Sequence, residues 1–243
     1  MSPPTARPFP RYIADASQEP RPTGRWAERL AKRFAEACGP LGPDAGAPLD
    51  PETIRWFPER AWGGRVYVPA TARASEPSVP SDSPEGAEPV LVEYYGWVSF
   101  VAPEAEDEPD DFDAGADFTD VTAEDSPDWQ IDLSDDVIGA WRSESGRGGD
   151  VTLVWGLPLR KGAVAATAEL DGEVVDQTPI HDGRFTLVAV DAVRGFGDEI
   201  YLAVKLWDHR LREVASESLY DEAADEPEDK PDDLPDEAPD EDR

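Results

Sequence analysis

Two histidines and one cysteine are the side chains in this sequence best suited to covalent or general-base catalysis. A nucleophile needs a base within hydrogen-bond reach, and that base is usually histidine. His181 and His209 both fall in predicted hairpin turns, where a histidine is usually an exposed surface group, and Cys38 closes a predicted helix with no histidine nearby in the sequence. We therefore expect no catalytic residue among the three, and a buried, inert thiol at Cys38.

Carboxylates are far more abundant, with 54 Asp and Glu among 243 residues, so pairs able to act as acid and base meet by chance. Calcium takes about six to eight oxygen ligands, and two groups of aspartates offer them: Asp110, Asp111, Asp113 and Asp117 in one acid-rich segment, and Asp191, Asp198 and Asp208 in later loops. The first group does not match an EF-hand loop, because aligning Gly115 with the sixth loop position places Phe112 at the third, where an acidic or amide residue is needed. A looser calcium site and ordinary turn aspartates are the two alternatives.

Three tryptophans with carboxylates nearby, Trp97, Trp129 and Trp141, are the best sequence support for a ligand cleft. Aromatic-lined clefts suit sugars and other flat ligands. This grouping supports a carboxylate- or metal-dependent hydrolase, with its site between the N-terminal aromatic part and the following domain. The competing interpretation is that the three rings belong to the core.

The elements that must position these residues are clearest after residue 150, where apolar runs alternate with turn residues at nearly even spacing. Six strands are predicted there, over residues 151–155, 164–170, 173–178, 184–190, 200–207 and 213–219. Asp171-Gly172 and His181-Asp182-Gly183 are typical of tight hairpin turns. Such short links exclude parallel pairing, which needs crossovers of about a dozen residues or more. The pattern therefore predicts a mainly β protein with an antiparallel β-sandwich, immunoglobulin-like or a related meander.

The segment GEVVDQTPIHDGRFTLV, residues 172–188, is similar to hairpins in carboxypeptidase-regulatory-like and other immunoglobulin-like modules. These modules also use an aspartate-glycine turn followed by an aromatic residue. The resemblance implies the β-sandwich class alone, because function belongs to a site and not to a fold.

One N-terminal helix is predicted before the strands. Trp26, Leu30 and Phe34 recur on one face of a helix over residues 24–37, and Thr23 can cap its start. Such an amphipathic helix is typical of one that docks its apolar face on the body of the protein.

A short helical turn and two strands are predicted to follow. The turn covers residues 50–56, where a capping aspartate precedes a proline, and the strands cover 65–68 and 90–101. The second strand is dense in aromatic residues around Gly96, which predicts burial on at least one side and a bulge at the glycine. The insert at 74–89 is rich in Pro, Ser and Glu and is predicted to be a disordered loop.

The net charge of −32 is unevenly distributed. Residues 1–70 hold 8 acidic and 10 basic side chains, residues 103–136 hold 15 acidic and none basic, and residues 221–243 hold 13 acidic and 2 basic. Both a high-salt cytoplasm and acidic interaction segments explain such a composition. The predicted organisation is a flexible arm at 1–22, a helix with aromatic strands at 23–101, an acidic loop at 102–117, the β-sandwich domain at 118–220 and a disordered acidic tail at 221–243.

The charge also limits the partners. A strongly negative field repels nucleic-acid phosphates and anionic lipid headgroups, so neither nucleic acid nor a membrane surface is expected as a partner. The opening residues lack an apolar signal segment, and no apolar run approaches the length of a membrane span, which predicts a cytoplasmic protein.

The sequence thus favours a non-enzymatic protein-binding or assembly module without a cofactor. Three features support this interpretation: the predicted antiparallel domain, the lack of a recognisable set of catalytic residues, and the uneven distribution of charge along the sequence. A protein partner would be contacted through a sheet edge or the acidic segments. The alternatives are a carboxylate- or metal-dependent hydrolase and a calcium-responsive β-sandwich.

Overall fold

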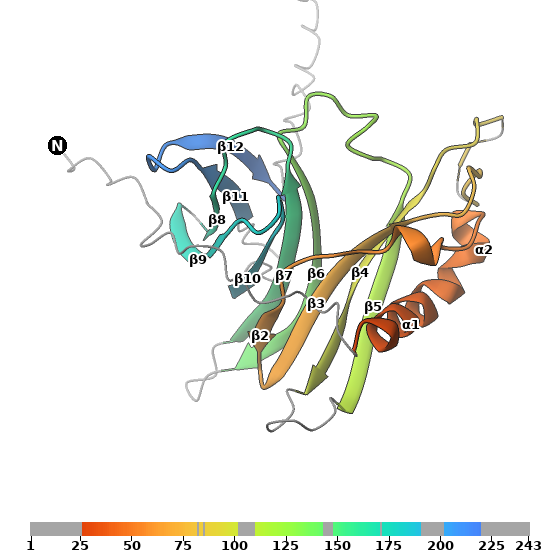
Figure 1. Ribbon diagram of the computed structural model, residues 1–243, viewed down its shortest axis with the longest axis horizontal. Coiled ribbons are helices and arrows are strands. Elements are labelled where there is room, and N and C mark those ends of the chain that lie inside the picture. The colour runs from red at the N-terminus through yellow and green to blue at the C-terminus, as the bar shows by residue number, and fades with distance from the viewer. Residues whose placement is uncertain are drawn as a thin grey trace, which may run out of the picture.

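The fold is mainly β and antiparallel, with one N-terminal helix, which confirms the predicted class. The computed structural model describes residues 26–81, 83–84, 86–101, 110–142, 148–170, 172–190 and 202–219. A helix and three sheets form successive layers across the molecule (Figure 1). The arm and the tail expected at 1–22 and 221–243 lie outside the described residues.

Helix α1 (Ala27–Cys38) covers the first sheet with its apolar side. Leu30, Phe34 and Cys38 are buried there, as the periodicity predicts. The helix starts later than expected, because Trp26 is its N-cap and makes no side-chain capping bond. None of the described helices has the length and apolar composition needed to cross a bilayer.

Short helical pieces follow α1 and lead into the first sheet. They are a 3₁₀ turn (Gly39–Leu41), α2 (Gly42–Ala45) and a second 3₁₀ turn (Pro51–Thr53). Asp50 caps the second turn by accepting a bond from the Glu52 amide at 3.0 Å, as predicted. The turn ends sooner than expected, however, because Arg55 and Trp56 already pair with a strand.

The first sheet has five strands. They are β1 (Arg55–Trp56), β2 (Arg60–Trp62), β3 (Arg65–Arg73), β4 (Glu93–Val101) and β5 (Asp110–Thr119), in the order β1-β3-β4-β5 with β2 also paired to β3. Ala70, Ala72 and Val98 on one face pack under α1. The opposite face turns toward the second sheet and carries Tyr67 and Trp97.

The acidic loop predicted over 102–117 is wrong from Asp110 onward, because β5 begins there. Its apolar residues Phe112, Ala114, Ala116 and Phe118 alternate with polar ones and pack toward α1. Residues 102–109 lie outside the described part. The strand thus follows ordinary period-two alternation, which the abundance of aspartate hides.

The insert at 74–89 is not a free loop where it is described. Ser78 bridges Val90 in antiparallel fashion, and its hydroxyl donates to the Ala45 carbonyl of α2 at 2.7 Å. The expected disorder is therefore replaced, around Ser78, by an irregular segment packed on α2.

The pairing of β4 with β5 is irregular between Ser99 and Val101, where β5 carries the extra residue, and not at Gly96 as predicted. Gly96 allows β4 and β5 to approach closely instead, because a Cβ at this position would collide with the carbonyl oxygen of Gly115 on β5.

Gly96→Ala is therefore expected to lower the free energy of unfolding by about 1–3 kcal/mol, because the strands must separate. Urea denaturation measures this change. Gly139→Ala, where a Cβ meets open space, is the control and should change it by less than about 0.5 kcal/mol.

Two further sheets form the sandwich. The three-stranded sheet has the order β10-β7-β6 and consists of β6 (Ile131–Arg142), β7 (Gly148–Pro158) and β10 (Phe185–Val190). The four-stranded sheet has the order β12-β11-β8-β9 and consists of β8 (Ala165–Leu170), β9 (Glu173–Pro179), β11 (Leu202–Trp207) and β12 (Glu213–Ser218). The six strands predicted after residue 150 are confirmed, as is a tight turn at Asp182 and Gly183, with φ of 43° and 71°. This turn does not join a hairpin as predicted, because β9 and β10 belong to different sheets.

The three-stranded sheet is the middle layer and is buried on both sides. Leu153 and Trp155 of β7 pack toward the first sheet, whereas Val154 belongs to the core shared with the four-stranded sheet. A hydrogen bond also links the first sheet to the middle sheet at one edge, where the Arg184 guanidinium donates to the Trp56 carbonyl at 2.9 Å. One continuous stack of apolar layers therefore joins the N-terminal strands to the sandwich.

Candidate functional site

The side chains with the strongest intrinsic chemistry do not form a catalytic group. His181 lies in the turn before β10, where its amide donates to the Arg184 carbonyl at 2.7 Å, and His209 is an exposed residue in the turn after β11. Cys38 is 1% exposed, and burial raises the pKa of its thiol to about 12. This confirms the predicted buried thiol, which stays protonated at neutral pH.

The aspartates singled out for calcium serve other contacts. Asp111 pairs with Arg65 at 2.6 Å. Asp208 accepts a bond from the Arg212 amide at 3.0 Å and two from the Arg212 guanidinium at 2.9 and 2.6 Å, and these bonds lower the pKa of Asp208 to about 2. Asp191 and Asp198 lie outside the described residues. In the described ranges, no group of three or more His, Cys, Asp or Glu side chains is arranged to hold a metal ion.

The three tryptophans do not line one cleft. Trp97 is 8% exposed and packs between the first two sheets. Trp129 precedes β6 and Trp141 lies near the other end of that strand, so they are more than about 30 Å apart along it. The aromatic cleft expected for a hydrolase is therefore absent from the described part of the chain.

Two strand edges without a strand partner lie side by side instead. Among the described residues β5 is the last strand of the first sheet and β6 is the last strand of the middle sheet. The Trp97 indole of β4, the strand next to β5, donates to Asp136 of β6 at 2.7 Å, and Ala116 and Asp117 of β5 line one pocket with Asp135 and Asp136 of β6. Residues 110–142, which contain both strands, carry eleven acidic side chains and one basic side chain, that of Arg142 at the end of β6. We call the paired edges of β5 and β6 the acidic edge.

A small pocket of about 130 Å³ opens in the acidic edge. Its lining residues come from three strands and are Tyr95, Gly96, Ala116, Asp117, Asp135 and Asp136. Burial and the three carboxylates raise the pKa of the Tyr95 hydroxyl. Gly115 allows β5 to approach β6, since a Cβ there would come within 3.0 Å of the Trp97 ring and 3.1 Å of the Asp136 carboxylate. The negative charge and small size of this acidic pocket suit an ammonium or guanidinium group.

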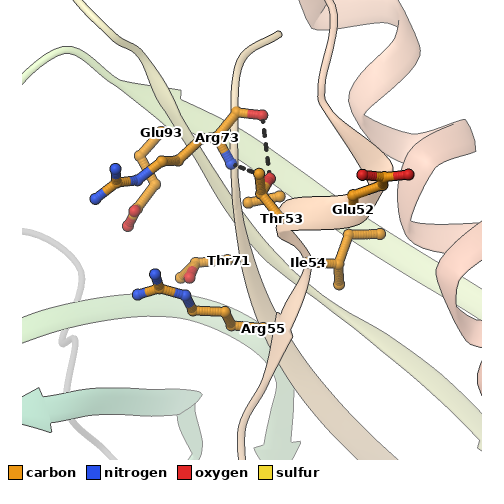
Figure 2. Close-up of a pocket in the computed structure, with 8 residues that line it drawn as sticks. Glu52, Thr53, Ile54, Arg55, Thr71, Arg73 and Glu93 are labelled. Carbon is orange, nitrogen blue, oxygen red and sulfur yellow. Dashed lines mark hydrogen bonds between the residues drawn. The ribbon is translucent and has the colours of Figure 1, made fainter.

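A second pocket of about 320 Å³ lies between β1, β3 and β4. It is lined by Glu52, Thr53, Ile54, Arg55, Thr71, Ala72, Arg73 and Glu93. Figure 2 shows the side chains of Arg55, Arg73 and Glu93 extending to the same side, with the Glu52 carboxylate directed away from them. The Thr53 hydroxyl accepts a bond from the Arg73 amide at 2.8 Å and so fixes the rim of the pocket to β3. We call it the mixed-charge pocket.

Nearby charges of both signs affect the pKa values of the carboxyl groups at the mixed-charge pocket. Burial raises the pKa of Glu93 to about 7, with a further increase from Asp132 of β6 and from Glu124, while Arg73 and Arg55 act against this shift. Burial also raises the pKa of Asp132, again opposed by Arg55. Arg73 forms an ion pair with Glu124, whereas Arg55 makes no salt bridge within the described residues. Near neutral pH the pocket therefore holds a carboxyl group poised between its two protonation states.

Several residues of these pockets were not predicted from the sequence. Tyr95 belongs to the aromatic run of the predicted strand at 90–101, but nothing in the pattern indicates which acidic residues face it. Arg55 and Glu93 meet only through the register of β1, β3 and β4, in which Arg55 opposes Thr71 and Glu93 opposes Arg73. The adjacent pair Asp135-Asp136 beside an apolar run was the one available signal.

Comparison with known proteins gives no match to a protein-family model, to a curated protein or to a solved structure.

Proposed function

We propose that this protein is a non-enzymatic protein-binding or assembly module that binds an extended basic segment of a partner protein along the acidic edge. The observation that carries the proposal is the pair of neighbouring edges, β5 and β6, which have no strand partner on their outer sides within the described residues and whose charged side chains are aspartates except for Arg142. An open strand edge offers backbone N–H and C=O groups to an added strand.

The charge of the acidic edge selects the partner. Aspartates along β5 and β6 repel a second copy of the same edge, which opposes self-pairing of two molecules. The same charges attract a chain rich in lysine or arginine and speed its association. In this arrangement the acidic pocket receives one cationic side chain of the added strand, between Asp117 and Asp135.

The cellular setting of the proposal is the cytoplasm, with a protein as the partner. A single cysteine leaves the chain without an internal disulfide, which suits a reducing compartment. The net charge of −32 disfavours nucleic acid and anionic lipid as alternative partners.

A peptide in which lysine alternates with valine tests the proposal. We expect it to bind the full chain at low salt and to lose affinity between about 0.05 and 0.5 M NaCl, because screening weakens surface electrostatics. Replacing Asp117 and Asp135 by Asn should lower the affinity about tenfold, equivalent to about 1.4 kcal/mol. Fluorescence anisotropy of a labelled peptide measures both effects.

The matched control removes the same charge elsewhere in the acidic segment. Asp120 and Asp128 are exposed outside the pocket, and replacing both by Asn should weaken binding by no more than about twofold. Equal losses for the two double variants, or no binding of the peptide at low salt, would contradict the proposal.

A further inference from the structure

We propose that the mixed-charge pocket binds a small zwitterion of the amino-acid class, with the ligand's carboxylate on Arg55 and its ammonium group against Glu93. This site is separate from the acidic edge and goes beyond the protein-binding function proposed above. The pocket volume of about 320 Å³ lies at the lower end of the range of ligand clefts, about 300–1,000 Å³, as a ligand of this size requires.

The register of the sheet separates the two kinds of charge. Arg55 lies on β1 and Glu93 on β4, and these strands flank β3 on opposite sides. Arg55 opposes Thr71 and Glu93 opposes Arg73, so the two residues are two strands and two positions apart, which separates their backbones by about 12 Å. Thr71 lies on β3 between them and lines the pocket (Figure 2). A ligand with opposite charges at its two ends fits this arrangement, with a charge-assisted hydrogen bond of about 2.8 Å at each end.

Ligands with a single charge suit the pocket less well. The protein carries a net charge of −32, which opposes the approach of a simple anion. A simple cation meets the guanidinium groups of Arg55 and Arg73. A zwitterion has no net charge, and it can place its carboxylate on Arg55 and its ammonium group against Glu93. Arg55 is available for the carboxylate, because it makes no salt bridge within the described residues, whereas Arg73 is already paired with Glu124.

Binding of a zwitterion should change the protonation of Glu93. The groups that face Glu93 are Arg73 of β3, Arg55 of β1, Asp132 of β6 and Glu124 of the segment before β6, and together with burial they place the pKa of Glu93 at about 7. A ligand ammonium group favours the ionised carboxylate. Binding therefore releases a proton, and the affinity should increase as the pH rises from 6 to 8. A simple anion would bind with the opposite pH dependence.

Calorimetric titration of the full chain tests the inference with glycine, alanine, serine and glutamine as probes. Propionate and ethylamine are the controls that carry one charge each. We expect at least one amino acid to bind, with propionate and ethylamine at least about tenfold weaker, because each leaves one charged wall without a partner. Binding of propionate as tight as that of the amino acids, or no heat from any amino acid, would overturn the inference.

Three variants assign the contacts. Arg55 is exposed, so Arg55→Gln should leave the fold unchanged, as melting temperature verifies, and weaken the amino acid about tenfold. Glu93→Gln should remove the pH dependence between pH 6 and 8. Glu76→Gln is the control, since Glu76 is exposed and does not line the pocket, and it should leave affinity and pH dependence unchanged. Affinity that falls as the pH rises, or an Arg55→Gln variant that binds like the parent, would overturn the inference.

The two proposals fail independently. Arg55→Gln leaves the acidic edge intact, so it should bind the lysine-valine peptide like the parent protein. Failure of the peptide to bind contradicts the protein-binding function alone, and failure of the amino acids to bind contradicts the zwitterion site alone.

Discussion

Lys205→Met should lower the free energy of unfolding by about 3–5 kcal/mol, because it leaves a buried carboxylate without its cation. Glu169 of β8 is 1% exposed, and its carboxylate lies 2.7 Å from the Lys205 ammonium group of β11. A polar chain supports the pair: the Trp207 indole donates to Thr167 at 2.9 Å, and the Thr167 hydroxyl donates to Glu169 at 3.3 Å. None of these bonds replaces the lost positive charge.

Urea denaturation of two further variants separates charge from packing. The double variant Lys205→Met with Glu169→Leu removes both charges and should recover most of the loss, since a buried ion pair replaced by apolar groups is often neutral. Lys161→Met removes an exposed lysine and should change the stability by less than about 0.5 kcal/mol. If Lys205→Met cost less than about 1 kcal/mol, the pair would not be electrostatically important for the fold.

The strands after residue 150 could be predicted because local signals agree there. Phe185, Leu187 and Ala189 are all fully buried on one face of β10, as their alternation requires, and the turn before them has the positive φ values that Asp182 and Gly183 tolerate. The pairs β8–β9 and β11–β12 follow each other directly in the chain, so nearby residues decide their pairing, whereas β7 with β10 and β8 with β11 pair across intervening strands.

The layer order could not be predicted in the same way. β5 was missed because its aspartates outweighed the alternation of Phe112 and Phe118, whose burial depends on the distant helix α1. The run at 151–155 is apolar on both faces, which is typical of a strand covered on both sides, yet it does not say what covers it. One of its faces is covered by β3 and β4, which lie many residues earlier in the chain.

The candidate site was harder to predict than the fold for a related reason. The acidic segment and its charge were visible, and the prediction of contact through a sheet edge still rests on them. The mixed-charge pocket, in contrast, needs Arg55 and Glu93 to meet across β3. Register over such distances is fixed by burial of one face of the sheet, and a single sequence does not specify the pairing partner.

Raising the pH from about 4.5 to 7 should progressively destabilise the protein through Glu93. The pKa of this carboxyl group rises from 4.5 to about 7 on folding, mainly through burial, so the folded state binds the proton more tightly than the unfolded state. Stability from this group is therefore fully present below pH 4.5 and is lost as the pH approaches 7, with little change above that value. The linkage relation gives a total of up to about 3 kcal/mol.

Among the described residues, the other carboxyl groups with a shifted pKa do not cancel this slope. The pKa of Asp132 is also raised by burial, so Asp132 acts in the same direction. Asp208 acts in the opposite direction, because bonds from Arg212 lower its pKa to about 2, but it titrates between about pH 2 and 4 and lies below the window. Glu93 and Asp132 together therefore predict falling stability toward neutral pH.

Glu93→Gln isolates the contribution of Glu93. At pH 8 the variant should be more stable than the parent by up to about 3 kcal/mol, because its side chain stays neutral in the same buried position, whereas at pH 4.5 the two should be nearly equal. Urea denaturation at a series of pH values measures the difference, and Glu76→Gln, at an exposed position, is the matched control with parallel curves. A constant difference between Glu93→Gln and the parent across this range would mean that Glu93 ionises as freely in the folded protein as in the unfolded chain.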